Sequence, residues 1–156
     1  MSDRPVRARA TSPASHTAVE PSERDFACAY EIAIASGDKR SSEEWARDIW
    51  EGAPAPVRWF MIAGWRFVLR LRLGPLHSPD NILGWRIVDR SADETVCQLG
   101  SGLLDARNIF QRADGALIWS TFVSYERRGA RVIWLPVSLI HRLLVRISLQ
   151  RAAAAS

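Results

Sequence analysis

The stretch that decides the fold spans residues 103–127 and reads LLDARNIFQRADGALIWSTFVSYER. Asp114-Gly115 at its centre is typical of a two-residue hairpin turn, because both positions of that turn need a positive φ. Large and small or polar residues alternate on each side, which predicts strands at 103–111 and 116–127. Both faces of the second strand are largely apolar. We therefore expect a central strand that is covered on both sides or lines a cavity.

The same alternation predicts three further strands, at residues 26–35, 83–90 and 95–100. The last two of these and the hairpin follow one another with only short turns between them, as in an antiparallel meander. Together with the strand at 26–35 they make about five strands in one sheet.

Three helices are predicted from capping residues and from apolar residues at helical spacing. The sequence SSEE at 41–44 supplies an N-cap and an acidic first turn for a short helix that ends before Gly52. Residues 56–73 form a second helix that is apolar on more than one side. A long last helix has Pro136 near its start, and its expected core stripe consists of Val137, Ile140, Leu143, Leu144 and Ile147.

The chain has 156 residues, of which 47% are hydrophobic and 24% charged. These proportions are ordinary for a globular domain and exclude a wholly disordered chain. Residues 1–24 differ, because they are rich in Ser, Thr, Ala, Pro and Arg and show no apolar periodicity. We therefore expect a disordered basic tail at 1–24, one domain at 25–152 and a frayed end at 153–156.

The formal net charge is +4, and Lys39 is the only lysine among the 21 basic residues. Arginine recognises phosphate and carboxylate groups through paired hydrogen bonds. Here the arginines are scattered, and no run exceeds Arg127-Arg128, so nucleic-acid binding is not favoured. No apolar stretch follows the basic N-terminal residues, so no secretory signal is predicted. A cytoplasmic location is expected, with a peripheral position at a membrane as the alternative.

The sequence lacks the common motifs of catalysis and metal binding. Two Cys and three His cannot build a disulfide framework or a zinc ribbon, and a Gly-rich phosphate loop, GxSxG and HExxH are absent. Cys28 and Cys97 lie among apolar neighbours on predicted strands, so we interpret them as buried structural cysteines. We expect no metal, no cofactor and no catalytic residue, and an enzyme is not favoured.

The predicted order of elements is one strand, two helices, a four-strand meander and a long closing helix. This order resembles the helix-grip fold of START and pollen-allergen-type (SRPBCC) proteins. Four further stretches are distinctive, namely SEEWAR at 42–47, LGWRIV at 83–88, TFVSYER at 121–127 and IHRLLV at 140–145. Through these stretches the chain, over about residues 24–152, also resembles an actinobacterial family of domains of unknown function.

The resemblance implies a curved antiparallel sheet that wraps around the C-terminal helix, with an apolar ligand held between the two. The sequence departs from that fold by predicting about five strands where six or seven are expected, which bears on the size of any cavity.

Aromatic residues are the first candidates for a ligand site. Tyr30, Trp85, Trp119 and Tyr125 fall on strand faces that could converge under the last helix, where large rings make rigid cavity walls. A solid core without a void explains the same pattern, since protein interiors are close-packed. Both interpretations stay open at this point.

His141 and Arg107 are the polar candidates. His141 lies at the edge of the last apolar stripe, where it would contact a ligand or, as is more usual, bond a backbone carbonyl or a tyrosine hydroxyl. Arg107 shares a strand face with Asp105. An inward face would let Arg107 bind a ligand carboxylate, whereas an outward face would make the two a solvated surface pair.

The favoured function is binding of an apolar small molecule, lipid-, polyketide- or isoprenoid-like, between the sheet and the C-terminal helix. A cyclase- or hydrolase-type enzyme is a further hypothesis. It would need a polar pair inside the cavity, with Asp105 or His141 required for turnover.

The rival hypothesis is docking on an anionic membrane or on a protein partner through the helix at 56–73. Its longest uncharged run, residues 59–65, is too short to cross a bilayer. Basic residues beside interfacial tryptophans are what a helix lying on an anionic bilayer requires, although burial of this helix within the fold would also explain them. The residues of this predicted surface are Arg58, Trp59, Trp65, Arg66 and Arg70.

Overall fold

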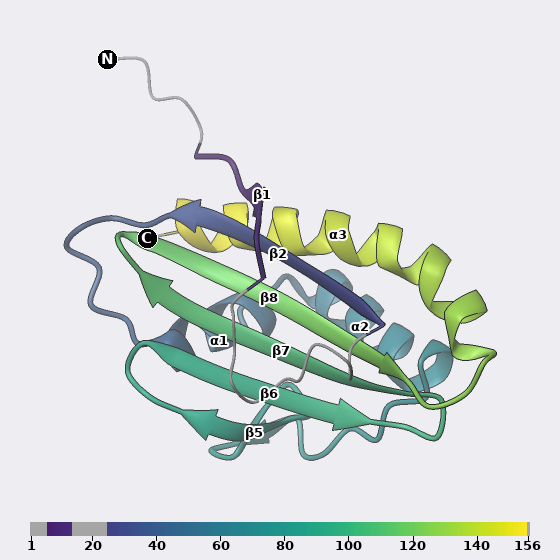
Figure 1. Ribbon diagram of the computed structural model, residues 1–156. Helices are drawn as coiled ribbons and strands as arrows, with labels where there is room; N and C mark the ends of the chain where they lie inside the picture. The colour runs from purple at the N-terminus through teal and green to yellow at the C-terminus, as the bar shows by residue number, and fades with distance from the viewer. Residues whose placement is uncertain (1–5, 14–24, 156) are drawn as a thin grey trace.

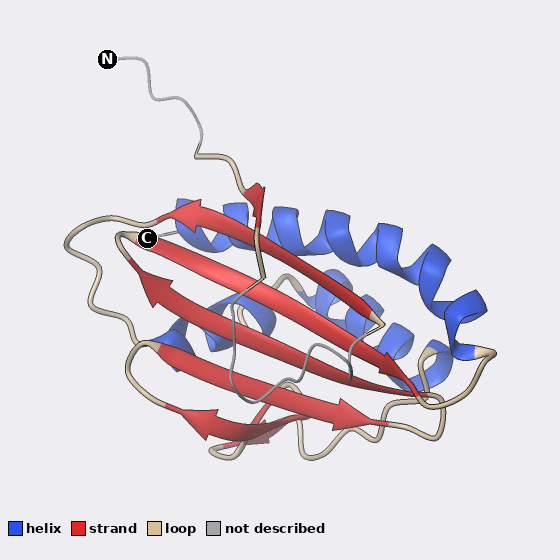
Figure 2. Cartoon of the chain, in the orientation of Figure 1, coloured by secondary structure: helices blue, strands red, loops and turns tan. Residues whose placement is uncertain are grey.

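A computed structural model describes residues 6–13 and 25–155. Within these residues the chain forms an α+β fold in which the helices pack on one face of an antiparallel sheet (Figures 1 and 2). The described strands lie in the order β1-β2-β8-β7-β6-β5-β4-β3. The predicted class, an antiparallel meander with a long C-terminal helix, is confirmed.

The elements have the following bounds. The strands are β1 (Arg9–Thr11), β2 (Phe26–Ala33), β3 (His77–Ser78), β4 (Asn81–Ile82), β5 (Trp85–Arg90), β6 (Glu94–Gly100), β7 (Leu104–Ala113) and β8 (Ala116–Tyr125). The helices are α1 (Ser42–Trp50), α2 (Ala55–Ala63), the π-helical segment η2 (Gly64–Val68) and α3 (Ala130–Ala154).

The hairpin of β7 and β8 forms the centre of the sheet. Asp114 and Gly115 have φ angles of 50° and 74°, which are the positive values that this turn needs. β7 and β8 pair without interruption from Leu104 opposite Tyr125 to Ala113 opposite Ala116. β2 pairs along the other side of β8, so β8 is the central strand that its apolar faces predict.

The sheet has more strands than the sequence predicts, with eight among the described residues rather than about five. The strand expected at 83–90 begins only at Trp85, because Leu83 and Gly84 form a turn in which their φ angles are 48° and 89°. This turn joins β4 to β5. Alternation could not reveal it, because an apolar leucine occupies a turn position that usually carries Asn or Gly.

Residues 9–11 form β1 on the edge of β2, with Ala10 opposite Tyr30. The interpretation of residues 1–24 as a disordered tail is therefore wrong for 9–11, since pairing with a neighbouring strand supplies backbone hydrogen bonds that composition does not reveal. The remainder of that prediction falls largely on residues 1–5 and 14–24, which lie outside the described residues. At the other end, α3 continues to Ala154.

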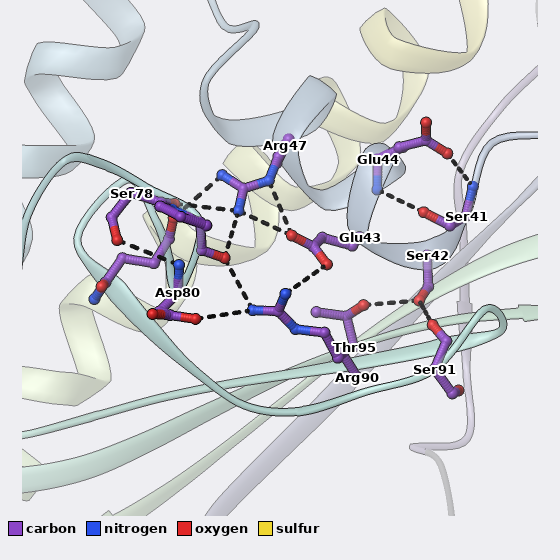
Figure 3. A network of polar contacts seen from close by, with 12 residues as sticks. Ser41, Ser42, Glu43, Glu44, Arg47, Ser78, Asp80, Arg90, Ser91 and Thr95 are labelled. Carbon is purple, nitrogen blue, oxygen red and sulfur yellow. Dashed lines mark hydrogen bonds and ion pairs between the residues drawn. The ribbon is translucent and has the colours of Figure 1, made fainter.

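α1 begins as the sequence predicts and is joined to the edge of the sheet by hydrogen bonds. Ser41 and Glu44 form a reciprocal capping box at its N-terminus. Arg47 pairs with Glu43 and donates to backbone carbonyl oxygens within residues 78–81 (Figure 3). It also pairs with Glu51. These contacts join the helix to β3, β4 and the turn between them.

The predicted helix at 56–73 is wrong beyond residue 68. α2 passes into the wider turns of η2, where the Leu69 amide donates to the Gly64 carbonyl oxygen at 3.0 Å. Arg70 then adopts a φ of 54° and ends the helix. A π-helical turn shifts the phase of the side chains. As a result Leu69 is buried while Phe67 is exposed.

α3 is the long last helix that the sequence predicts, but its expected core stripe is right only for Val137 and Leu144, which pack against the core. Ile140, Leu143 and Ile147 are about half exposed. The residues that face the sheet and α1 are Ala130, Trp134, Ser138, Val145, Ser148, Leu149 and Ala152. The helix carries apolar residues on two faces. The buried face also carries small serines, which a periodicity pattern counts as polar. The pattern therefore favoured the more exposed face.

Candidate functional site

A cavity of about 490 Å³ lies between the sheet, the α2–η2 segment and α3. This volume is within the range of small-molecule sites, which are concave and mostly apolar. The cavity is lined by side chains from the strands β5, β7 and β8 and from the helices α1, α2, η2 and α3. Five of them are tryptophans, namely Trp50, Trp65, Trp85, Trp119 and Trp134.

Trp50 organises the aromatic wall. It is fully buried at the end of α1, and its ring centroid lies 5.5 Å from those of Trp65 and Trp85, 5.8 Å from that of Trp119 and 5.1 Å from that of Phe110. Three of these four contacts are edge-to-face, the arrangement that aromatic rings prefer. The cluster therefore holds η2, β5, β7 and β8 around one side of the cavity.

Three indole N–H groups in this wall have no acceptor within the described part of the chain, those of Trp50, Trp85 and Trp134. A buried donor without an acceptor costs about 1–3 kcal/mol. Trp119 differs, since its Nε1 donates to Asn108 Oδ1 at 2.8 Å. Of these four tryptophans, only Trp119 therefore has an acceptor for its indole N–H among the described residues.

A polar corner interrupts the apolar lining where β7, β8 and α3 meet. Asn108 Oδ1 accepts from Trp119 Nε1 and from Thr121 Oγ1, the latter at 2.7 Å. An indole N–H can only donate, so the amide oxygen of Asn108 must face it. The orientation of Asn108 and the direction of the Thr121 hydroxyl follow from this single requirement.

His141 completes the polar corner from α3. Its Nε2 lies 3.0 Å from Thr121 Oγ1. Because the Thr121 hydroxyl hydrogen is directed to Asn108, Nε2 carries the proton and Nδ1 is left as an acceptor. Burial and, to a smaller extent, the positive charge of the nearby Arg142 together lower the pKa of His141 to about 4. The ring is therefore neutral at neutral pH.

The two cysteines are buried free thiols, as interpreted from the sequence. Burial raises the pKa of Cys28 to about 11 and that of Cys97 to about 12. Only the thiolate is a nucleophile, so neither cysteine is activated. Cys28 lies opposite Thr121 in the register of β2 and β8.

The structure brings three of the six predicted ligand-site residues to the cavity wall, Trp85, Trp119 and His141. Tyr30 is buried in the core on β2 but is not part of the wall, and Tyr125 lies partly exposed at the end of β8. The three residues that do line the cavity come from β5, β8 and α3, which are far apart in sequence.

Arg107 lies on the face of β7 that points away from the helices, and its Nη2 donates to Gln98 Oε1 at 3.0 Å. Asp105 is on the same face and accepts from Gln98 Nε2. The placement of Arg107 in a ligand site is therefore wrong. The cause is strand parity, because on β7 the inward residues are Leu104, Ala106, Asn108 and Phe110.

The five residues predicted for a membrane or partner surface divide into two groups. Trp59, Arg66 and Arg70 are exposed. Arg58 instead donates to the carbonyl oxygens of residues 51 and 53 at the end of α1, and Trp65 packs against the aromatic wall. Arg58 and Trp65 thus serve the fold, and only the first group is available at a surface.

Sequence reasoning missed Asn108 and Thr121 as members of the site. One signal was present, since Asn is disfavoured in strands and Asn108 shares a strand face with Ala106 and Phe110. A polar residue on an otherwise apolar inward face requires a buried partner. The partners themselves come from β8 and α3, so no local pattern could name them.

The mouth of the cavity is marked by lining residues that are also exposed. Phe60, Phe67 and Val68 border it from α2 and η2, and Ile140 borders it from α3. The opening therefore lies between the α2–η2 segment and α3, on the side of the molecule away from the sheet.

No protein-family model matches this chain, and no curated protein matches it. Within residues 6–13 and 25–155, no group of three or more His, Cys, Asp and Glu side chains is placed to hold a metal ion.

Proposed function

We propose that this protein binds an apolar small molecule, such as a lipid, polyketide or isoprenoid, in the cavity between the sheet and α3. The observation that carries the proposal is the cavity of about 490 Å³. Close packing normally fills the interior of a domain. An open, aromatic-walled space of this size is the default form of a small-molecule site.

The arrangement of elements supports a helix-grip type of fold for the domain. The strand that precedes the helices, β2, pairs with the last strand, β8, and α3 then packs across β2 and β8. A sheet with this strand order leaves the space between it and the C-terminal helix for a guest. The π-helical turn of η2 also falls at the mouth, and such turns are frequent at functional sites.

The polar corner defines where a polar group of the guest would lie. Among the described residues that line the cavity, Asn108, Thr121 and His141 are the only ones with polar side chains other than indoles. With His141 neutral, its Nδ1 offers an acceptor, which complements a hydroxyl or amide N–H on the guest. We therefore favour a largely apolar guest that carries a hydrogen-bond donor at this corner.

The same groups favour binding over cyclase or hydrolase chemistry. An efficient general base has a pKa near the working pH, whereas that of His141 is about 4. Asp105, the other residue considered for catalysis, is on the opposite face of the sheet and hydrogen-bonds Gln98 there. The two residues thus do not form a polar pair inside the cavity.

Titration with a fluorescent fatty-acid probe tests the proposal. Wild-type protein should bind the probe saturably at one site. Ala106→Leu extends a side chain from β7 into the cavity, and we expect it to weaken binding by about tenfold or more. Leu144→Trp fills the cavity from α3 and serves if Ala106→Leu fails to fold. Ala113→Leu makes the same change at an exposed position of the same strand and should bind like wild type.

Native mass spectrometry of freshly purified protein provides an independent readout. An apolar molecule retained by wild type and lost from Ala106→Leu would support the proposal. Saturable probe binding that is equal in wild type and both filled variants would place the site elsewhere and overturn it. Absence of both a retained molecule and probe binding would overturn it as well.

A further inference from the structure

Charge is segregated in this chain. The segments 53–79 and 127–156, which contain α2, η2 and α3, hold ten arginines and no acidic residue. The rest of the chain holds the other 11 basic residues and all 17 acidic residues. Eight of the ten arginines are exposed. The other two, Arg58 and Arg151, donate to backbone carbonyl oxygens in α1 or just after its end. The helices that enclose the cavity mouth are therefore purely cationic.

The same helices expose large apolar side chains. On α3 a stripe faces away from the sheet and runs the length of four turns, with Val132 and Leu139 being 76% and 71% exposed. The stripe consists of Val132, Leu135, Leu139, Ile140, Leu143 and Ile147. Monomeric soluble proteins rarely leave a contiguous apolar patch of this kind open to water.

α2 and η2 contribute the second part of this surface. Phe67 is 74% exposed and Trp59 is 61% exposed. Phe60, Phe67 and Ile140 all border the cavity mouth, so the apolar side chains of α2–η2 meet the α3 stripe there. Figure 1 shows α2 and α3 on the same side of the sheet. We call the exposed apolar residues of α2, η2 and α3 the docking surface.

We propose that the docking surface binds an anionic lipid bilayer. Insertion of Trp59, Phe67 and the α3 stripe removes apolar area from water, and the surrounding arginines are attracted to anionic headgroups. The absence of any acidic residue on these segments means that nothing on them opposes this attraction. The proposal stands on the exposed residues and the charge pattern, and it does not need the cavity to be occupied.

A second copy of the chain fits the surface less well than a bilayer. A two-fold dimer would bring the same patch of each copy face to face. The exposed arginines on each copy, which include Arg66, Arg131 and Arg146, would then oppose one another without an acidic partner. Like charges across an interface disfavour association, whereas an anionic bilayer neutralises them.

α3 lies on the bilayer in this arrangement and does not cross it. It has 25 residues, and an 18-residue window within it has a mean hydropathy of 1.6, so it is long and apolar enough to span a membrane by length and composition alone, a test that core helices of soluble proteins also pass. Trp134, Val145 and Leu149 are buried on its other face. Spanning would strip that face from the sheet, while docking leaves it in place.

Because the mouth lies within the docking surface, a guest could pass between the bilayer and the cavity without crossing water. This consequence rests on the proposed function. The docking itself is tested separately, since Ala106→Leu should lose probe binding and keep vesicle binding.

Sedimentation with vesicles tests the proposal, using phosphatidylcholine alone and phosphatidylcholine mixed with phosphatidylglycerol. Wild-type protein should bind the anionic vesicles preferentially. Binding should weaken as ionic strength rises from about 0.1 M to about 1 M, over which the Debye length falls from ~10 Å to ~3 Å. The double variant Phe67→Ser with Leu139→Ser should lose about tenfold or more of this binding.

Two control variants sharpen the experiment. Val88→Ser removes an exposed apolar side chain from β5, outside the docking surface, and should bind vesicles like wild type. Arg66→Gln with Arg146→Gln keeps the apolar surface and should lose the preference for anionic vesicles. The changed residues are all exposed, and far-UV circular dichroism should be the same for all these variants.

Three outcomes would overturn the proposal. The first is equal binding to the two kinds of vesicle, or to neither. The second is a stable dimer that Phe67→Ser with Leu139→Ser dissociates, which would assign the surface to a second copy. The third is protein that alkaline carbonate fails to release from membranes, because a helix that only lies on the bilayer is released.

Discussion

His141 on α3 and Thr121 on β8 are joined by a contact of 3.0 Å between Nε2 and Oγ1. Thr121 donates in turn to Asn108 on β7, so one polar chain ties the C-terminal helix to the two central strands. All three residues also line the cavity. The groups that hold α3 on the sheet are therefore the groups that a guest would meet.

Thr121→Val should destabilise the protein by about 1–3 kcal/mol, because it leaves the buried His141 N–H without an acceptor and removes one donor to Asn108. Thr121→Ser keeps the hydroxyl and should lose less. The free energies of unfolding in urea give the comparison. Equal losses for Val and Ser would mean that the hydroxyl does not hold the helix.

The free energy of unfolding should decrease as the pH is lowered, over a range set by the pKa values of His141. The pKa of a free histidine is about 6.5, and that of His141 in the folded protein is about 4. The unfolded chain therefore binds the proton first. The contribution of the neutral ring is complete above pH 6.5 and is lost as the pH falls toward 4, by up to about 3 kcal/mol.

His141→Gln isolates this effect, because glutamine retains an N–H donor for Thr121 and does not titrate. We expect urea unfolding to show a steeper loss of stability between pH 6.5 and pH 4 in wild type than in the variant. Parallel curves would contradict the assignment of a lowered pKa to His141.

Arg47→Lys should destabilise the protein by about 1–3 kcal/mol. The guanidinium pairs with Glu43 and Glu51 and also donates to backbone carbonyl oxygens of residues 78–81. A lysine ammonium lacks the planar fork that makes these contacts together. Arg86→Lys, at an exposed position of β5, is the matched control and should change the thermal midpoint little.

Gly84→Ala should be more harmful than Gly115→Ala, although both glycines have a positive φ, of 89° and 74°. A Cβ on Gly84 would lie 3.0 Å from Leu73 Cδ2 and 3.3 Å from the Gly74 carbonyl oxygen, whereas one on Gly115 would meet nothing within 4 Å.

We expect Gly115→Ala to lower the free energy of unfolding by about 1–2 kcal/mol through backbone strain alone. Gly84→Ala should lower it by more. Because Gly84 precedes Trp85 in the cavity wall, only Gly84→Ala should also weaken probe binding. Equal losses of stability in the two variants would show that the contact with Leu73 adjusts without cost.

About half of the candidate site was accessible from the sequence. Trp85, Trp119 and His141 stand out as large or titratable residues on predicted inner faces. The α2–η2 boundary did not stand out, since the wider turn at Gly64 changes which side chains face inward after it. The sequence did not decide whether the strand face that carries Arg107 points inward or outward. It cannot choose between the two faces of a strand when both carry apolar residues.

Local interactions were readable from the sequence by itself. Asp114-Gly115 determined the central hairpin because its backbone conformation is intrinsic to those two residues. Ser41 and Glu44 determined the start of α1, since a capping box closes within one turn. The period-two strands and the long apolar C-terminal segment determined the α+β class in the same way.

Tertiary structure alone decided which apolar face of α3 is buried. Both faces satisfy the helical pattern, and the sheet covers the one that carries Trp134, Val145 and Leu149 with small residues between them. Ile140 and Leu143 are left outside. The burial of a side chain depends on what packs against it, and the elements that enclose the cavity and expose the docking surface come from distant parts of the chain.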